Sequence, residues 1–395
     1  MREFKSILRF ILGAVMLSVA TLTLAAGHAV KAKIGLFTPL TGASAIVGLD
    51  MQRGAQLAIE RVNAGYKVPL KDGKSRSIGP GLMGSPVELI IEDDESRAAA
   101  AMDAVRKLVS VNNVAVVIGE YSSGRTMPTG QWTNENKVVH ISIGANSPKL
   151  RDIGPYFFST IGLASLQGPQ LVKLAKSEVG AKKIATFFPN NPYGVGVEIA
   201  TCEAAPQMGL ECVAKVRYEE QKTDYRPELR QLTAPDPDAV IFFAYGAEAA
   251  LVLRQAYEMG LKAAEKWIGT EVSNWGHEVT ETPVIAEGIR GIEHSVGGDF
   301  YDKGYAQAYQ KRFGEPPLTV FGAYGYDSAM LAALAIQKAG STDSDAIRKA
   351  LFEVSKTFHG FTGDTSVDKD GMQVSEAYGT FIFKDGALRP YSPKM

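Results

Sequence analysis

The sequence predicts an α/β fold of two doubly wound, mainly parallel sheets that follow one another along the chain. Short continuous apolar runs alternate with segments whose apolar residues recur at helical spacing, which is typical of parallel strands covered on both faces. The alternation begins near residue 33 and starts again near residue 184, with no low-complexity linker between. A chain of 395 residues is long enough for two such units.

The first unit opens with the apolar run Lys33–Thr38 and a helix predicted over 51–63. Further strands are predicted where apolar runs end at a glycine or an acidic turn, and helices where the apolar spacing returns to three and four. These strands cover 87–92, 114–118, 138–143 and 156–162, and these helices cover 98–109 and 127–136. The segment 66–85 carries Gly, Pro, Lys and Asp, and we interpret it as a long surface loop or a small hairpin.

The second unit repeats this alternation. Its strands are predicted over 184–188, 211–218, 239–244 and 267–269, and its helices over 195–207, 225–232 and 247–259. After a strand-like segment that starts near residue 291, helices are predicted over 303–313, 324–339 and 344–352, and a hairpin strand over 378–383. Because extra helices follow the second unit, we expect the chain to cross back to the first unit through strand-like hinge segments.

The first 29 residues have the order of a secretory signal peptide. Arg2, Lys5 and Arg9 precede the apolar run 10–24, and small residues follow at 25–29, where we expect cleavage. An uncleaved anchor is the alternative, because the apolar run is only slightly shorter than the roughly 20 residues of a membrane span. No cysteine follows the run, so we expect no lipid anchor. We therefore expect a soluble mature chain that is exported to the periplasm.

The chain is accordingly divided into three parts. Residues 1–29 form the signal peptide. The first lobe is predicted to comprise 30–158 plus 293–357, and the second lobe 159–292 plus 358–395. The two lobes are expected to be joined by a hinge of three segments.

The net charge limits the binding partners that we expect, and the cysteine content limits the possible disulfides. The 42 basic and 43 acidic residues give a net charge of −1, which offers no electrostatic reason to expect nucleic acid or an anionic membrane surface. The two cysteines are Cys202, on a predicted helix, and Cys212, on the following strand. An oxidising compartment permits a disulfide between them, and two buried thiols are the alternative.

The chain lacks the usual signatures of catalysis. None of its histidines has a metal-binding spacing, and there is no G-x-S-x-G motif; the histidines are His28, His140, His277, His294 and His359. Gly194-Val195-Gly196 is only a partial dinucleotide fingerprint, and a helix start that needs close backbone approach explains it better. We therefore expect neither an enzyme, nor a metal site, nor a cofactor. Of Asp93 and Asp94, which point to opposite faces of a strand end, at least one is expected to be structural.

Two loops at the carboxyl ends of predicted strands are suited to bind a ligand. Residues 121–124 (YSSG) follow the third strand, and residues 144–148 (GANSP) follow the fourth, where Ser147 is a plausible N-cap and Pro148 a first helical residue. Helix N-termini at this edge of a parallel sheet favour an anion such as a carboxylate. Ordinary helix capping is the alternative role for each loop.

The chain resembles the Leu/Ile/Val-binding protein family, the type I periplasmic binding proteins that deliver solutes to ABC importers. KIGLFTPLTGASAIVGLDMQRGAQLAIERVN is similar to the family's first strand, loop and helix. VVIGEYSSGRTMP and ISIGANSPKL resemble its two ligand loops, and FFPNNPYGVG, PDPDAVIFFAYG and FGAYGYDSAMLAALAI resemble further segments. The similarity covers nearly all of the mature chain.

The resemblance implies a ligand site shared by two lobes. In the first lobe it implies contacts from the two loops, at Ser122, Ser123, Gly144, Ala145 and Asn146. In the second lobe it implies Tyr193, Tyr245 and Glu271, the last as partner of a ligand ammonium.

Three positions bear on how far this chain follows the family pattern. Asn146 replaces a common hydroxyl residue, and Val47 replaces an aromatic residue that often covers the ligand. Trp275 either compensates for Val47 or fills the core.

The first hypothesis is therefore a periplasmic binding protein for an amino acid, branched-chain or otherwise aliphatic, which works as a monomer with the membrane permease of an ABC importer. The second keeps the fold but takes an aromatic carboxylate, urea or a short amide as ligand. The third, a receptor sensing domain or an exported enzyme, has little support, since we find neither a later membrane span nor a nucleophile–base pair.

Overall fold

The computed structural model describes residues 31–393 apart from 276–278, 280–281, 295, 297–300 and 376. The predicted signal peptide lies outside the described residues. No helix within them has both the length and the apolar character needed to cross a membrane.

The first sheet is wholly parallel, with strand order β4-β1-β5-β6-β7. Its strands are β1 (Lys33–Thr38), β4 (Glu88–Asp93), β5 (Val116–Ile118), β6 (Val139–Ser142) and β7 (Phe157–Ser159). Neighbouring side chains on β1 enter different cores: Leu36 packs with α2 (Ala45–Ala64), and Phe37 packs with α3 (Ala98–Arg106). Both faces of the sheet are therefore covered, as in a doubly wound fold.

The second sheet repeats the same order, β9-β8-β10-β11-β12, and then adds the antiparallel strands β15 and β16. Its strands are β8 (Lys183–Pro189), β9 (Glu211–Tyr218), β10 (Ala239–Phe242), β11 (Trp267–Thr270), β12 (Arg290–His294), β15 (Tyr378–Lys384) and β16 (Ala387–Pro390). One apolar core joins it to α5 (Gln167–Leu174) and α6 (Pro192–Gln207), and another joins it to α7 (Arg226–Thr233) and α8 (Gly246–Glu258). The short helix α9 (Ala263–Lys266) precedes β11.

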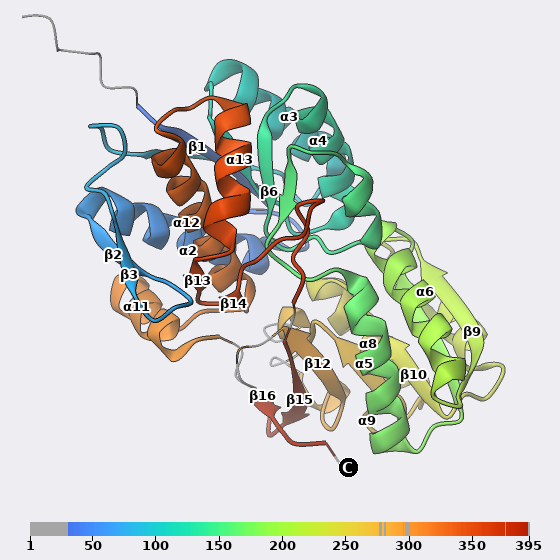
Figure 1. Ribbon diagram of the computed structural model, residues 1–395. Coiled ribbons are helices and arrows are strands. Elements are labelled where there is room, and N and C mark those ends of the chain that lie inside the picture. The colour runs from blue at the N-terminus through green and yellow to red at the C-terminus, as the bar shows by residue number, and fades with distance from the viewer. Residues whose placement is uncertain are drawn as a thin grey trace, which may run out of the picture.

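The chain returns to the first sheet after β12. Helices α11 (Lys303–Phe313) and α12 (Phe321–Ala339) lie beside the blue N-terminal helix α2 in Figure 1, although they are orange to red. Helix α13 (Ser344–Ser355) packs against α12. Buried Asp50 on α2 accepts hydrogen bonds from the backbone N–H and the hydroxyl of Thr319, at 2.8 and 2.9 Å. The predicted crossing back is thus present.

Several helices begin earlier than predicted. Helix α2 begins at Ala45 rather than at 51, and α4 (Ser123–Glu135) begins at Ser123 rather than at 127. The first turn of α4 contains small and polar residues, which apolar spacing cannot reveal. The first turns of α2 contain Ile46, Val47 and Leu49, and the predicted helix simply began too late. Helix α5 was not predicted at all, because its first residues are Gln167, Gly168 and a proline. The segment 66–85 forms the hairpin of β2 (Tyr66–Pro69) and β3 (Ser75–Ile78), the second of the two expected alternatives.

Residues 358–374 make their contacts with the first sheet and its helices. They include β13 (His359–Gly360) and β14 (Gly363–Asp364). Buried Asp327 on α12 accepts the backbone N–H groups of Phe361 and Thr362, and Ser159 donates its N–H to the carbonyl of Gly371. The sequence-based division placed this segment in the second lobe, together with β15 and β16. We propose the two-lobe division with residues 358–374 assigned to the first lobe.

Cys202 on α6 and Cys212 on β9 are joined by a disulfide, with Cα atoms 5.4 Å apart. It links the last turns of the helix to the strand that follows it. The second lobe is therefore cross-linked within one helix–strand unit.

Candidate functional site

The candidate residues come from five loops at the carboxyl ends of strands. In the first lobe the loops follow β5 and β6, and in the second they follow β8, β10 and β11. This is the edge at which ligands bind in open α/β sheets. Hydrogen bonds and ring contacts between the loops of the two lobes bring the candidate residues into one cluster.

Glu271 lies at the centre of this cluster and is 2 % exposed. Its Oε1 accepts hydrogen bonds of 3.2 Å from Asn146 Nδ2 and from Gln167 Nε2, and its Oε2 accepts one of 3.3 Å from the hydroxyl of Tyr121. His294 Nε2 lies 3.9 Å from Oε1. The backbone of Glu271 has a φ of 50°, an uncommon conformation for a residue with a side chain. The side chain is thus held in place from both lobes.

Two tyrosines of the second lobe form a wall of the cluster. The Tyr245 hydroxyl lies 3.5 Å from Ser122 Oγ and accepts a hydrogen bond of 3.1 Å from Asn191 Nδ2. Burial raises the pKa of Tyr245, and burial together with the charge of Glu271 raises the pKa of Tyr193 well above its ordinary value. Both phenols therefore keep their protons and can donate to an acceptor.

Backbone N–H groups in the two first-lobe loops already donate hydrogen bonds within the protein. The N–H groups of Gly144 and Ala145 donate to the carbonyl of Glu120 at 3.0 and 3.3 Å, and that of Ser122 donates to the Glu120 carboxylate. In this state these N–H groups donate to the protein itself. A Cβ atom at Gly144 would lie 2.9 Å from Met51 Cε and 3.0 Å from Tyr121 Cδ2, so the side chains around this glycine are closely packed.

The serines of the two loops have different partners. Ser122 is the N-cap of α4, because its Oγ accepts the N–H of Gly124 at 3.3 Å. Ser123 Oγ accepts the N–H of Ser147 at 3.1 Å, which ties the two loops together. We expected Ser147 to cap a helix, but its side chain makes no capping hydrogen bond. Its Oγ instead donates to the carbonyl of Pro192 in the second lobe at 2.8 Å.

The glycines of the partial fingerprint serve close packing. A Cβ at Gly194 would lie 2.1 Å from the carbonyl oxygen of Pro189, and one at Gly196 would lie 2.6 Å from Pro148 Cδ. This is the helix start with close backbone approach that the sequence favoured. Pro148 belongs to the first lobe, so Gly196 allows the two lobes to touch. A groove of about 360 Å³ runs along this contact and includes Asn191 and Ile199.

Trp275 fills the core of the second lobe and does not cover the cluster. Its side chain is fully buried, its Nε1 donates to the carbonyl of Ala244 at 3.0 Å, and its ring contacts Phe242 and Phe383. The second of the two alternatives for this residue is therefore correct.

Sequence reasoning included Tyr121 only as part of the loop 121–124, and it missed three further members of the cluster. Tyr121 stands next to the predicted serines, but neither Gln167 nor His294 was singled out for this site, and Phe321 contacts both Tyr121 and His294 with its ring. Gln167 begins the helix that was not predicted. Only the motif around Tyr121 carried a signal that could have placed it in the site.

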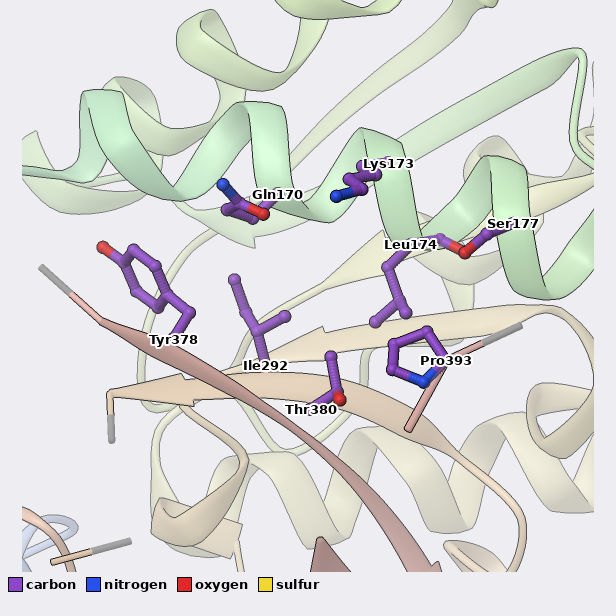
Figure 2. Close-up of a pocket in the computed structure, with 8 residues that line it drawn as sticks. All are labelled: Gln170, Lys173, Leu174, Ser177, Ile292, Tyr378, Thr380 and Pro393. Atoms are coloured by element: carbon purple, nitrogen blue, oxygen red, sulfur yellow. The ribbon is translucent and has the colours of Figure 1, made fainter. Parts of the chain in front are cut away.

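No group of three or more His, Cys, Asp or Glu side chains among the described residues could hold a metal ion. A second cavity, of about 260 Å³, lies away from the cluster between α5 and the strands β12 and β15. Figure 2 shows Leu174 pointing toward Pro393 in this cavity, with Ile292 and Thr380 on the sheet below and Lys173 at the helix. It contains none of the candidate residues.

The periplasmic binding protein family model matches residues 31–387. The chain belongs to the periplasmic binding protein family. Members of this family are solute-binding proteins of ABC transporters, as the resemblance had implied. The two-sheet fold with its shared edge is that of the type I members.

Curated relatives of this periplasmic binding protein match it over most of its length. Leu/Ile/Val-binding protein homolog 1 of Brucella abortus is 27% identical over 366 residues, covering 91% of this chain and 92% of that protein. The leucine-, isoleucine-, valine-, threonine- and alanine-binding protein of Pseudomonas aeruginosa is 29% identical, with 86% of each chain covered.

Solved structures have the same fold. The branched-chain amino-acid binding protein LivJ of Streptococcus pneumoniae, in complex with isoleucine, has a TM-score of 0.78 and 27% identity, covering 92% of this chain and 99% of that one. A solute-binding protein of R. palustris in complex with benzoate has a TM-score of 0.75 and 19% identity, covering 92% and 96%. Proteins of this fold therefore hold chemically different ligands.

Proposed function

We propose that this protein binds an amino acid with a branched or other aliphatic side chain in the cleft between its lobes. After export to the periplasm, it delivers the ligand to the permease of an ABC importer. The observation that carries the proposal is the buried carboxylate of Glu271, which is reached by donors from both lobes. The names of the relatives support this ligand class.

The ammonium end of the ligand is assigned to Glu271. The three hydrogen bonds from Tyr121, Asn146 and Gln167 come from neutral donors. A ligand ammonium would form charge-assisted hydrogen bonds with the same carboxylate, which are stronger than bonds from neutral donors. It would enter by displacing one or more of the neutral donors, and Tyr121 has the longest of the three bonds.

The carboxylate end is assigned to the start of α4. The side chains of Ser122 and Ser123 lie at the N-terminus of this helix, where the macrodipole favours an anion. Tyr245 faces Ser122 from the second lobe and keeps its hydroxyl proton. A carboxylate that accepts from both would link the two lobes, because its donors stand on both.

The aliphatic side chain is assigned to an apolar wall in the first lobe. Met51, Tyr121 and Phe321 surround Gly144 at close contact, and Val47 is buried on the same helix as Met51. This wall offers an aliphatic ligand an environment without unpaired polar groups, which keeps its burial favourable.

A second ligand class, an aromatic carboxylate, follows from the aromatic residues of the cluster. Tyr121 contacts Tyr245 and Phe321 edge to face, with ring centres 5.7 and 4.9 Å apart. Aromatic rings of a ligand pack well in such settings. Urea and short amides, which need no charge partner, belong to the same alternative.

Titration calorimetry of the mature protein separates these ligands. The panel contains the aliphatic L-amino acids, benzoate, urea and acetamide. Binding of an aliphatic amino acid with none of benzoate supports the first proposal, and the reverse result supports the second. A folded protein that binds none of them would refute both proposed ligand classes.

The export and delivery steps need separate experiments. The mass of the chain recovered from the periplasm tests cleavage between residues 25 and 29. Co-purification with the permease tests the delivery step.

A further inference from the structure

Glu120 lies directly before the first ligand loop, is fully buried, and contacts both loops of the first lobe. Its carboxylate Oε2 accepts the N–H of Ser122, and its backbone carbonyl accepts the N–H groups of Gly144 and Ala145. One residue therefore holds the loop after β5 and the loop after β6 in register.

Arg125 links this residue to the rest of the sheet edge. Its Nε pairs with Glu120 Oε1 at 2.5 Å, its Nη1 donates to the carbonyl of Ser96 at 3.2 Å, and its Nε lies 3.6 Å from Asp94 Oδ1. Arg125 is 5 % exposed, and Asp94 is fully buried. A buried ion pair of this kind is costly to break, because the remaining charge has no water to solvate it.

Burial and the neighbouring charge of Glu120 raise the pKa of Asp94 to about 9, so Asp94 keeps its proton at neutral pH. The single positive charge of Arg125 is then balanced by the single negative charge of Glu120. The pair is electrically complete within the protein, and it is not needed to neutralise a ligand.

We propose that Glu120 and Arg125 are positioning residues, which hold Tyr121, Ser122 and Ser123 in the geometry that binds the ligand. The pair acts through the backbone of the two loops and does not touch the ligand. Only the expected change in ligand affinity rests on the proposed function. The effect of the Glu120–Arg125 pair on the two loops is expected in the ligand-free protein as well.

The test compares the double variant Glu120→Gln/Arg125→Met with wild type. This variant removes both charges together, so no buried charge is left unpaired and the fold is expected to persist. The matched control is Glu60→Gln/Arg312→Met, which removes an Arg–Glu pair on the surface of α2 and α11, far from the loops. Circular dichroism and thermal melting show whether each variant is folded.

The deciding measurement is amide hydrogen exchange of the ligand-free proteins. In wild type and in the control, the segments 119–126 and 142–148 are expected to exchange slowly. In the double variant both segments are expected to exchange about tenfold faster or more, while the rest of the first lobe is unchanged. Unchanged exchange in both segments would overturn the proposal. If the double variant does not fold, Arg125→Lys, which keeps a positive charge beside Glu120 but removes the planar guanidinium, is measured in the same way.

Calorimetry with L-leucine adds a second measurement. The dissociation constant of the double variant is expected to rise roughly tenfold or more, with no comparable change in the control. Wild-type affinity in a variant whose loops exchange faster would overturn the positioning role. If wild type itself binds neither L-leucine nor the other amino acids, the proposed function fails, and hydrogen exchange still decides whether the pair holds the loops.

Discussion

Asn146 and Glu271 are 125 residues apart in the sequence, and Asn146 Nδ2 donates to Glu271 Oε1 at 3.2 Å. Asn146 follows β6 of the first sheet, and Glu271 follows β11 of the second. This hydrogen bond therefore joins the two lobes at the point where the candidate ligand groups meet. The proposed ligand ammonium would compete with this contact for Glu271.

Replacing Glu271 by Gln is expected to weaken the binding of an amino acid by about 100-fold, or about 3 kcal/mol. The amide keeps the size of the side chain but leaves the ligand ammonium without a charge partner. The affinity for benzoate is expected to change little, since benzoate has no cation. Titration calorimetry measures both. Glu198→Gln, at another buried glutamate, which pairs with Arg217, is the matched control and is expected to keep wild-type affinity. Equal losses for both ligands would contradict the assignment.

Replacing Gly196 by Val is expected to hinder closure of the lobes. The built Cβ lies only 2.6 Å from Pro148 Cδ in the opposite lobe, so the lobes must move apart. We expect weaker ligand binding and a larger radius of gyration in small-angle scattering with ligand present. At Gly124, by contrast, a Cβ would lie 3.8 Å from Asn191 Cβ, an ordinary contact, so Gly124→Ala is expected to close normally. A Gly196→Val protein as compact as wild type would show that the contact does not control closure.

Acid is expected to destabilise the protein through His140. Burial lowers the pKa of His140 to about 4, and its Nε2 lies 2.7 Å from the carbonyl of Gly119. Below about pH 6.5 the unfolded chain takes up a proton that the native imidazole does not. The contribution of His140 to stability is therefore complete above pH 6.5 and is lost as the pH falls to 4, by about 3 kcal/mol.

Urea unfolding of His140→Gln at pH 7, 5.5 and 4.5 measures this contribution. The variant is expected to lose less stability between pH 7 and 4.5 than wild type does, whatever its stability at pH 7. His359→Gln, at an exposed histidine, is the control and is expected to follow wild type. The same loss in His140→Gln as in wild type would assign the acid sensitivity to other groups.

Removing the disulfide is expected to lower stability without changing ligand affinity. Cys202 and Cys212 are separated by 10 positions, and closing a loop of that length stabilises a protein by about 3 kcal/mol in the chain-entropy model. The variant Cys202→Ala/Cys212→Ala is compared with wild type by urea unfolding and by calorimetry. Reductant is expected to destabilise wild type and to have no effect on the variant. A large change in affinity would mean that the cross-link shapes the cleft.

Most strands could be located from the sequence, because each is a continuous apolar run between turns. The predicted strand 211–218 coincides with β9, and the predicted helix 303–313 coincides with α11. Helix starts at the cleft were less well located. The first turn of α4 holds Ser123 and Gly124, which serve capping and loop contacts and leave no apolar period to detect.

The candidate site was less predictable than the fold. The family resemblance implied ligand contacts at Glu271, Asn146 and Tyr245, and the structure brings these side chains into one cluster. Gln167 was missed, because a polar residue at the start of a short helix has no distinguishing local pattern. The hydrogen bonds from the N–H groups of Gly144 and Ala145 to the carbonyl of Glu120 also have no signature in the sequence.

By itself, the sequence determined the α/β class, the two successive units and the succession of most strands along the chain. Those features depend on the spacing of apolar residues within each short segment, which can be read from that segment alone. Only the tertiary structure decided that Trp275 fills a core, that residues 358–374 pack on the first lobe, and that three side chains converge on Glu271. These partners are Tyr121, Asn146 and Gln167, at separations of 150, 125 and 104 residues. Contacts over such separations are fixed by how the two sheets pack, which no local pattern records.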